Sequence, residues 1–124
     1  MEELIYKEES YTIIGKCMEV HRELGHGFLE VIYKDALEIL FREEGIPFER
    51  EKEYPIYFKG IQLPHKYNAD FVVYDKIILE VKCVSVILDE HIAQTLNYLK
   101  ASGNILALLV NFSRGKLEYK RLVL

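Results

Sequence analysis

Residues 68–82 read Asn-Ala-Asp-Phe-Val-Val-Tyr-Asp-Lys-Ile-Ile-Leu-Glu-Val-Lys, two apolar runs joined by a short polar turn. Each run is typical of a buried strand, so the stretch predicts a β-hairpin. Asp70 precedes the first run, Glu80 ends the second, and Lys82 follows two residues later. Burying an isolated charge is unfavourable, so these charges need partners. A divalent cation would satisfy both carboxylates, and an ammonium group would balance a bound phosphate.

The register of the hairpin decides whether these side chains meet. Glu80 and Lys82 share a face because side chains alternate along a strand. A turn centred on Asp75 would place Asp70 opposite Glu80 on that same face. A two-residue turn at Asp75 and Lys76 would put the two acids on opposite faces, unless a bulge corrected it. The sequence leaves both turns open, and a solvated strand face remains the simpler interpretation of Glu-x-Lys.

Apolar periodicity divides the rest of the chain into helices and strands. Ser10 and Asp89 can cap the first and third helices, and the second has an apolar stripe that includes Ile32 and Leu37. The order of two helices, about five strand segments, a helix and two strands predicts an α/β domain with a central mixed sheet flanked by helices. We expect one domain over residues 1–124. The expected helices are 10–24, 29–44 and 89–100, and the expected strands are 48–53, 56–59, 66–74, 76–84, 105–110 and 116–122.

Composition indicates a soluble globular chain, with half of its residues hydrophobic and 29% charged. No apolar run approaches the ~20 residues that span a bilayer, and the N-terminus lacks the pattern of a signal peptide. Cys17 and Cys83 fit no metal-binding pattern. We therefore expect a cytoplasmic protein with reduced thiols and no membrane association.

The distribution of charge limits the ways in which this chain can hold nucleic acid. A net charge of −4 argues against a general electrostatic grip on phosphates. From Lys100 onward, however, there are five bases and one acid, Glu118. This C-terminal segment is either a phosphate-binding face or a solvated strand surface.

Three short motifs resemble a known family. Asp70 with residues 80–82, in this order of elements, resembles the site of the PD-(D/E)XK nuclease superfamily. Residues 94–98, Gln-Thr-Leu-Asn-Tyr, resemble the QxxxY signature of its RecB-like exonuclease branch. Residues 27–33, Gly-Phe-Leu-Glu-Val-Ile-Tyr, resemble the signature of the GxxExxY protein family of the same superfamily. Ala69 stands where a proline often precedes the first aspartate in this superfamily. The resemblance implies a restriction-endonuclease-like fold.

The resemblance implies a metal site on the hairpin. Asp70, Glu80 and the backbone carbonyl of Val81 would bind Mg²⁺, with Mn²⁺ as a possible substitute. Such an ion polarises the scissile phosphate and lowers the pKa of a bound water. Lys82 would orient or deprotonate that water, or neutralise the charge that grows on the phosphate.

The resemblance also assigns roles to three residues outside the hairpin. Glu30 would be a third acid that binds a second ion or orients a metal-bound water. Gln94 and Tyr98, which are four residues apart on one helix face, would orient Lys82 or the substrate. Each residue has a structural alternative, because a carboxylate at a helix start faces the helix dipole and a tyrosine often lies at the edge of a core.

Three functions follow from this interpretation. The first is metal-dependent hydrolysis of phosphodiester bonds in nucleic acid, DNA more than RNA, by a homodimer or with a protein partner, since one small domain offers limited surface to a duplex. The second is a non-catalytic adaptor that uses a nuclease fold to bind nucleic acid or a protein partner. The third is a core domain whose charges meet by chance.

Overall fold

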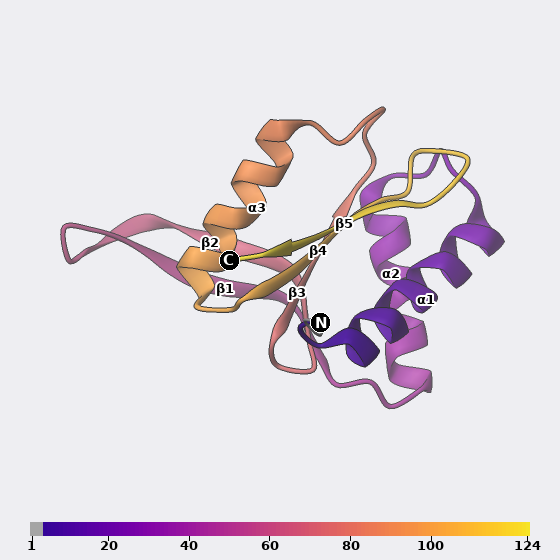
Figure 1. Ribbon diagram of the computed structural model, residues 1–124, viewed down its shortest axis with the longest axis horizontal. Helices are drawn as coiled ribbons and strands as arrows, with labels where there is room; N and C mark the ends of the chain where they lie inside the picture. Colours follow the sequence, from indigo (N-terminus) through magenta and orange to yellow (C-terminus); the bar gives the residue numbers. More distant parts are fainter. Residues whose placement is uncertain (1–3) are drawn as a thin grey trace.

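The computed structural model describes residues 4–124 of the chain. Within them the five strands form one mixed sheet in the order β1-β2-β3-β4-β5, which is parallel only between β3 and β4 (Figure 1). The predicted α/β fold, a central mixed sheet flanked by helices, is confirmed. The elements are α1 (Lys7–Leu24), α2 (Glu30–Glu43), β1 (Phe48–Phe58), β2 (Ile61–Val73), β3 (Ile77–Lys82), α3 (Asp89–Ser102), β4 (Leu106–Asn111) and β5 (Glu118–Val123).

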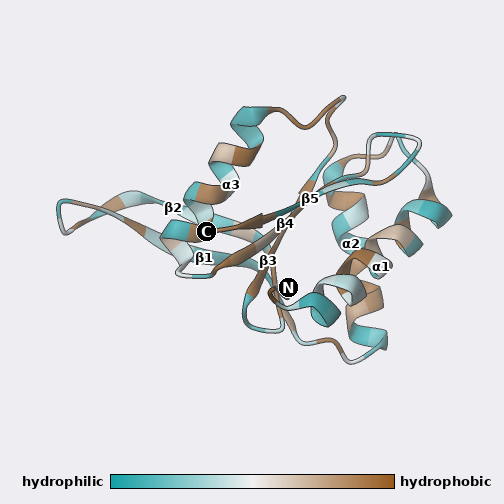
Figure 2. Ribbon diagram, viewed as in Figure 1, coloured by the Kyte–Doolittle hydropathy of each residue, from teal (hydrophilic) through white to brown (hydrophobic). Residues whose placement is uncertain are grey.

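The sheet separates two hydrophobic cores. The larger core joins α1 and α2 to one face, and the smaller core joins α3 to the other. Strands β3 and β4 contribute alternate residues to both cores, so they carry almost continuous apolar sequence, and Figure 2 shows them as the hydrophobic centre of the fold. No helix within residues 4–124 has the length and apolar character needed to cross a membrane.

The helices differ from the predicted ones at their starts and on one buried face. α1 begins at Lys7, and Ser10 lies inside it with its hydroxyl donating to the carbonyl of Tyr6 at 2.7 Å instead of capping the helix. α3 begins at Asp89 itself, so this residue is not the cap. In α2 the predicted stripe is confirmed at Leu37, and Ala36 and Leu40 pack against the same core, whereas Ile32 is 38% exposed. Apolar residues surround much of α2, so their spacing alone does not fix the edges of the buried face. The buried residues of α2 are Tyr33, Leu37 and Phe41.

The first two strands form a long hairpin that extends beyond the rest of the sheet (Figure 1). The predicted segments 48–53 and 56–59 belong to the single strand β1, and the predicted strand 66–74 begins already at Ile61 in β2. The register shifts between Pro55 and Tyr57, where proline has no N–H to donate. The two strands are joined by a turn at Gly60, whose φ of 76° suits glycine.

Candidate active site

The register of the β2–β3 hairpin aligns the two predicted acids. Val73 pairs with Ile77, so the turn is centred on Asp75. Continuing this register places Asp70 opposite Glu80, which is the first of the two arrangements that the sequence allowed. The backbone of Asp75 has φ of 60°, a left-handed conformation that Asp and Asn adopt more readily than most residues.

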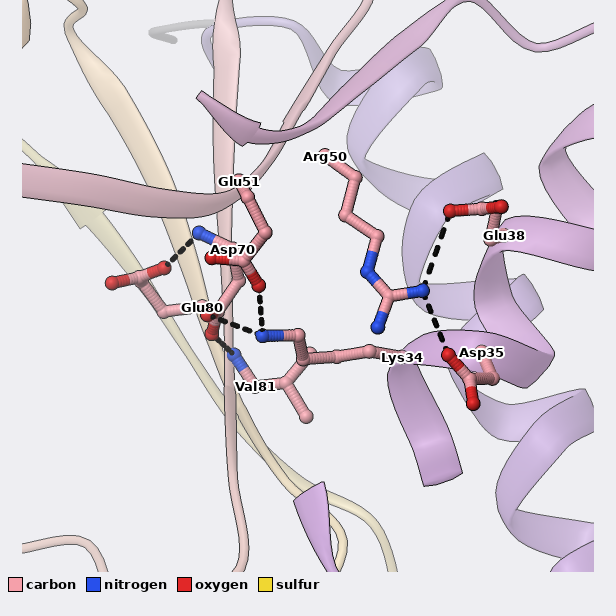
Figure 3. A network of polar contacts seen from close by, with 8 residues as sticks. All are labelled: Lys34, Asp35, Glu38, Arg50, Glu51, Asp70, Glu80 and Val81. Atoms are coloured by element: carbon pink, nitrogen blue, oxygen red, sulfur yellow. Dashed lines mark hydrogen bonds and ion pairs between the residues drawn. The ribbon is translucent and has the colours of Figure 1, made fainter. Parts of the chain in front are cut away.

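The two strands part where these acids lie. The antiparallel pairing of β2 and β3 ends before Asp70 and Glu80, after which β2 remains paired with β1 and β3 with β4. Hydrogen bonds to the two acidic side chains take the place of the backbone hydrogen bonds that would otherwise join β2 and β3 here. The N–H of Asp70 donates to Oε2 of Glu80 at 2.9 Å, and the N–H of Val81 donates to Oδ2 of Asp70 at 2.8 Å (Figure 3). Each carboxylate therefore holds the backbone beside the other.

The alternation of β2 also breaks at this point. Ala69 packs in the core on the α3 side, whereas Phe71 packs in the core on the side of α1 and α2. Residues two positions apart in a strand ordinarily point to the same face of the sheet. Across the sheet, the backbone of Glu51 in β1 has φ of 56°, and the pair that it would form with Asp70 is missing from an otherwise continuous register. This irregularity turns Asp70 toward the gap between the strands.

Glu80 is buried in a setting that disfavours its charged form. Its residue is 4% exposed. Burial, and then the charge of Asp70, raise the pKa of Glu80 from 4.5 to about 8. The hydrogen bond from the N–H of Asp70 and the charge of Lys82 act in the opposite direction but do not prevail. A buried acid pair of this kind is typical of a functional site.

Two tyrosines form the wall of the site on the α3 side. The rings of Tyr67 and Tyr98 stack with centroids 3.7 Å apart. The buried hydroxyl of Tyr67 forms no hydrogen bond of standard geometry among the described residues but lies close enough to Glu80 to lower the pKa of that acid, and burial followed by the charge of Glu80 raises the pKa of Tyr67. Burial and the charges of Glu80 and Asp70 also raise the pKa of Tyr98. The structure thus brings Tyr98 to the acids, while Gln94, one turn earlier in α3, is exposed.

Lys82 lies on the same strand as Glu80, two residues further along β3. Its side chain is partly buried and forms no ion pair within residues 4–124. Its backbone is fixed, since its carbonyl accepts the N–H of Phe112 at 2.9 Å. Its charge lowers the pKa of Glu80, so the ammonium group lies within electrostatic reach of that acid while forming no ion pair within residues 4–124.

Two residues that the sequence analysis missed complete the charge arrangement. Lys34 of α2 donates to Oδ1 of Asp70 at 3.1 Å and to the carboxylate of Glu51 in β1. Burial by itself lowers the pKa of Lys34, but its hydrogen bond to Glu51 and the charge of Asp70 raise it overall, so this lysine remains charged. The one available signal was that Lys34 follows Glu30 by four residues and so shares its helix face.

Glu30 stands at the start of α2 and is exposed. With Lys34 and the partly buried Cys83 it lines an open groove of about 640 Å³ beside the acid pair. Burial and the charge of Glu30 raise the pKa of Cys83 to about 11. Among residues 4–124, no group of three or more acidic, histidine or cysteine side chains is placed to hold a metal ion, so Glu30 does not join Asp70 and Glu80 in such a group.

The donor set at the gap nevertheless suits a hard cation. The donors are oxygen atoms of the Asp70 and Glu80 carboxylates and of the Val81 backbone carbonyl. Mg²⁺ accepts such ligands together with several waters. Burial and the charge of Asp70 raise the pKa of Glu80, so a cation bound between the two acids would favour the charged form of Glu80. These residues therefore fit a bound divalent cation.

Fold and site together define a nuclease-like α/β domain with a carboxylate pair and a lysine where two strands part. The chain belongs to the PD-(D/E)XK nuclease superfamily, whose family model matches residues 7–122. No curated protein matches the sequence.

Two solved structures share the fold. The crystal structure of SSO0001 has a TM-score of 0.61 and 19% sequence identity, covering 95% of this chain and 57% of that one. An alkaline exonuclease (LHK-Exo) from Laribacter hongkongensis has a TM-score of 0.55 and 13% identity, covering 98% of this chain and 72% of that one. The chain thus spans little more than half the length of SSO0001.

Proposed function

We propose that this protein hydrolyses phosphodiester bonds in nucleic acid, DNA more than RNA, with a divalent cation bound at Asp70 and Glu80. The observation that carries the proposal is the pair of acids whose side chains bond the backbone where β2 and β3 part, with Lys82 two residues along β3 forming no ion pair within residues 4–124. Membership of a nuclease superfamily supports the same reaction class.

The residues divide into metal-binding and substrate-binding groups. Asp70, Glu80 and the carbonyl of Val81 would hold Mg²⁺ or Mn²⁺, with Glu30 at the groove as a further acid. When bound, the ion supplies Lewis-acid polarisation of a phosphate and a more acidic water. Lys82 then stabilises the negative charge that develops on the phosphate, because its ammonium group has no carboxylate partner of its own.

The helix α3 supplies the wall opposite the groove. Tyr98 stacks on Tyr67 and lies near both acids, so it limits the side from which a phosphate approaches. Gln94 is exposed one turn away and would hydrogen-bond the substrate backbone. We also propose, from Gly27, Glu30 and Tyr33, that the chain belongs to the GxxExxY group and acts in the cytoplasm as a homodimer or with a protein partner.

The net charge of −4 favours a second candidate, a non-catalytic adaptor. An acidic surface disfavours contact with bare DNA, since phosphate neutralisation by Lys and Arg dominates the affinity of most DNA-binding proteins. In that case the nuclease fold would bind a protein partner, and the acid pair would have no role in hydrolysis.

A binding and cleavage experiment separates the two. Calorimetry with Mn²⁺ is performed on the wild type and on Asp70→Asn, with Asp75→Asn as the control because Asp75 is exposed in the turn of the same hairpin. The nuclease hypothesis predicts binding that only Asp70→Asn removes. It also predicts cleavage of a single-stranded, duplex or branched DNA panel that Lys82→Ala abolishes while circular dichroism stays unchanged. Metal binding without any cleavage, or no binding at all, would favour the adaptor.

A further inference from the structure

Lys34 occupies an unusual position for a surface-helix lysine. Its side chain is 12% exposed, and its ammonium group lies between two carboxylates that come from different strands, Asp70 of β2 and Glu51 of β1 (Figure 3). Within residues 4–124 it is the only cation that forms an ion pair with either acid. Lys34 therefore neutralises the side of Asp70 that the N–H of Val81 does not occupy.

The neighbouring charges hold Lys34 in this place. Arg50, next to Glu51 in the chain, does not compete for Glu51, because its guanidinium donates to Asp35 at 2.8 Å and to Glu38 at 3.3 Å (Figure 3). These bonds tie β1 to α2 on the helix face adjacent to Lys34. As a result Glu51 has Lys34 as its ion-pair partner, and Lys34 has a carboxylate available on each side.

We propose that Lys34 is a positioning residue that stands in for the divalent cation on Asp70 and transfers fully to Glu51 when the cation binds. This inference rests on the metal site of the proposed function. A divalent cation at Asp70 would repel the ammonium group, which bonds Oδ1 of the same carboxylate. An ammonium left unpaired in a mostly buried position would be unfavourable, and Glu51 provides the second partner that prevents this.

The exchange predicts opposite effects for the two partners. Lys34→Met removes the competing cation, and we expect it to tighten Mn²⁺ binding about tenfold in calorimetry. Glu51→Gln deprives Lys34 of its second partner, and we expect binding to weaken severalfold. In the double variant Lys34→Met/Glu51→Gln, the Glu51→Gln change should no longer weaken Mn²⁺ binding, because there is no ammonium group left for Glu51 to pair with.

Lys16 provides a matched control. It also bridges two carboxylates, Glu19 and Glu44, and its side chain is 19% exposed, but it lies on α1 away from the acid pair. Lys16→Met should leave Mn²⁺ affinity unchanged. If Lys34→Met fails to fold by circular dichroism, Lys34→Gln serves in its place, since the amide retains a hydrogen bond to Asp70 without the charge.

The outcomes distinguish the exchange from the metal site itself. Wild-type binding that Asp70→Asn abolishes, combined with no effect of Lys34→Met, would overturn the exchange and leave the metal site intact. An equal loss from Glu51→Gln with and without Lys34 would also overturn it, because Glu51 would then act directly on the ion. Absence of Mn²⁺ binding in the wild type would overturn both.

Discussion

Replacing Glu80 with glutamine tests the electrostatics on which the site depends. Burial and the charge of Asp70 raise the pKa of Glu80 to about 8, so without metal this carboxyl is largely protonated near neutral pH. The groups that face it are Asp70 and Tyr67 on β2, Lys82 on β3 and Tyr98 on α3. Glutamine keeps an oxygen that accepts the N–H of Asp70 but has no proton to lose.

The sign of the effect follows from proton binding. The unfolded chain releases the Glu80 proton near pH 4.5, whereas the folded protein keeps it until about pH 8. Between these values the folded state binds one more proton, so the free energy of unfolding decreases as the pH rises. At about 1.4 kcal/mol per pH unit, a pKa moved from 4.5 to about 8 corresponds to a loss of about 5 kcal/mol.

Urea unfolding of the wild type and Glu80→Gln, in EDTA at about pH 5, 7 and 9, measures this loss. The titration of shared groups cancels in the difference between the two proteins. We expect the variant to gain about 4 kcal/mol relative to the wild type between pH 5 and pH 9, because part of the total falls below pH 5. Glu53→Gln, an exposed change on β1, should show no such trend. A wild-type–variant difference that stays constant from pH 5 to 9 would refute the reasoning.

Three further substitutions test individual contacts by urea unfolding. Tyr67→Phe should be neutral or stabilising by up to about 1 kcal/mol, because it removes a buried hydroxyl with no hydrogen-bond partner; a clear destabilisation would show that the hydroxyl is bonded. Asn111→Ala should destabilise by about 2–4 kcal/mol, since its buried amide bonds both the N–H and the carbonyl of Val84. Tyr33→Phe should lower the free energy of unfolding by about 1–2 kcal/mol, because it removes the 2.7 Å hydrogen bond to the carbonyl of Gly25. As a control, Tyr119→Phe on the exposed strand β5 should lower it by less than about 0.5 kcal/mol.

The alignment of the two acids could be narrowed to two registers because the information is local. Two apolar runs of β2 and β3 meet at a short turn, and only two registers were compatible with that spacing. The structure selects the one centred on Asp75, whose side chain tolerates the left-handed backbone that the turn needs. Opposition of Asp70 and Glu80 then follows from strand geometry.

The contact of Lys34 with Asp70 could not be predicted in the same way. The two residues are 36 positions apart, and their meeting depends on which face of α2 packs on the sheet. Apolar residues on several sides of α2 left the edges of that face undecided: Leu37 is buried as predicted, but Ile32 is exposed. The irregular backbone of Glu51 has no signature in sequence either, because a left-handed glutamate is uncommon in a strand.

The parting of β2 from β3 has a mechanical consequence. Asp70 belongs to the long β1–β2 hairpin and Glu80 to the β3–β4 pair, and at the acids two side-chain hydrogen bonds link these parts beyond the last β2–β3 backbone pair. The hairpin tip at Ile61 lies about 30 Å along β2 from Asp70. A partner that tilts this arm would therefore change the spacing of the carboxylates and shift Tyr67 and Ala69 in the smaller core, while leaving α1 and α2 in place.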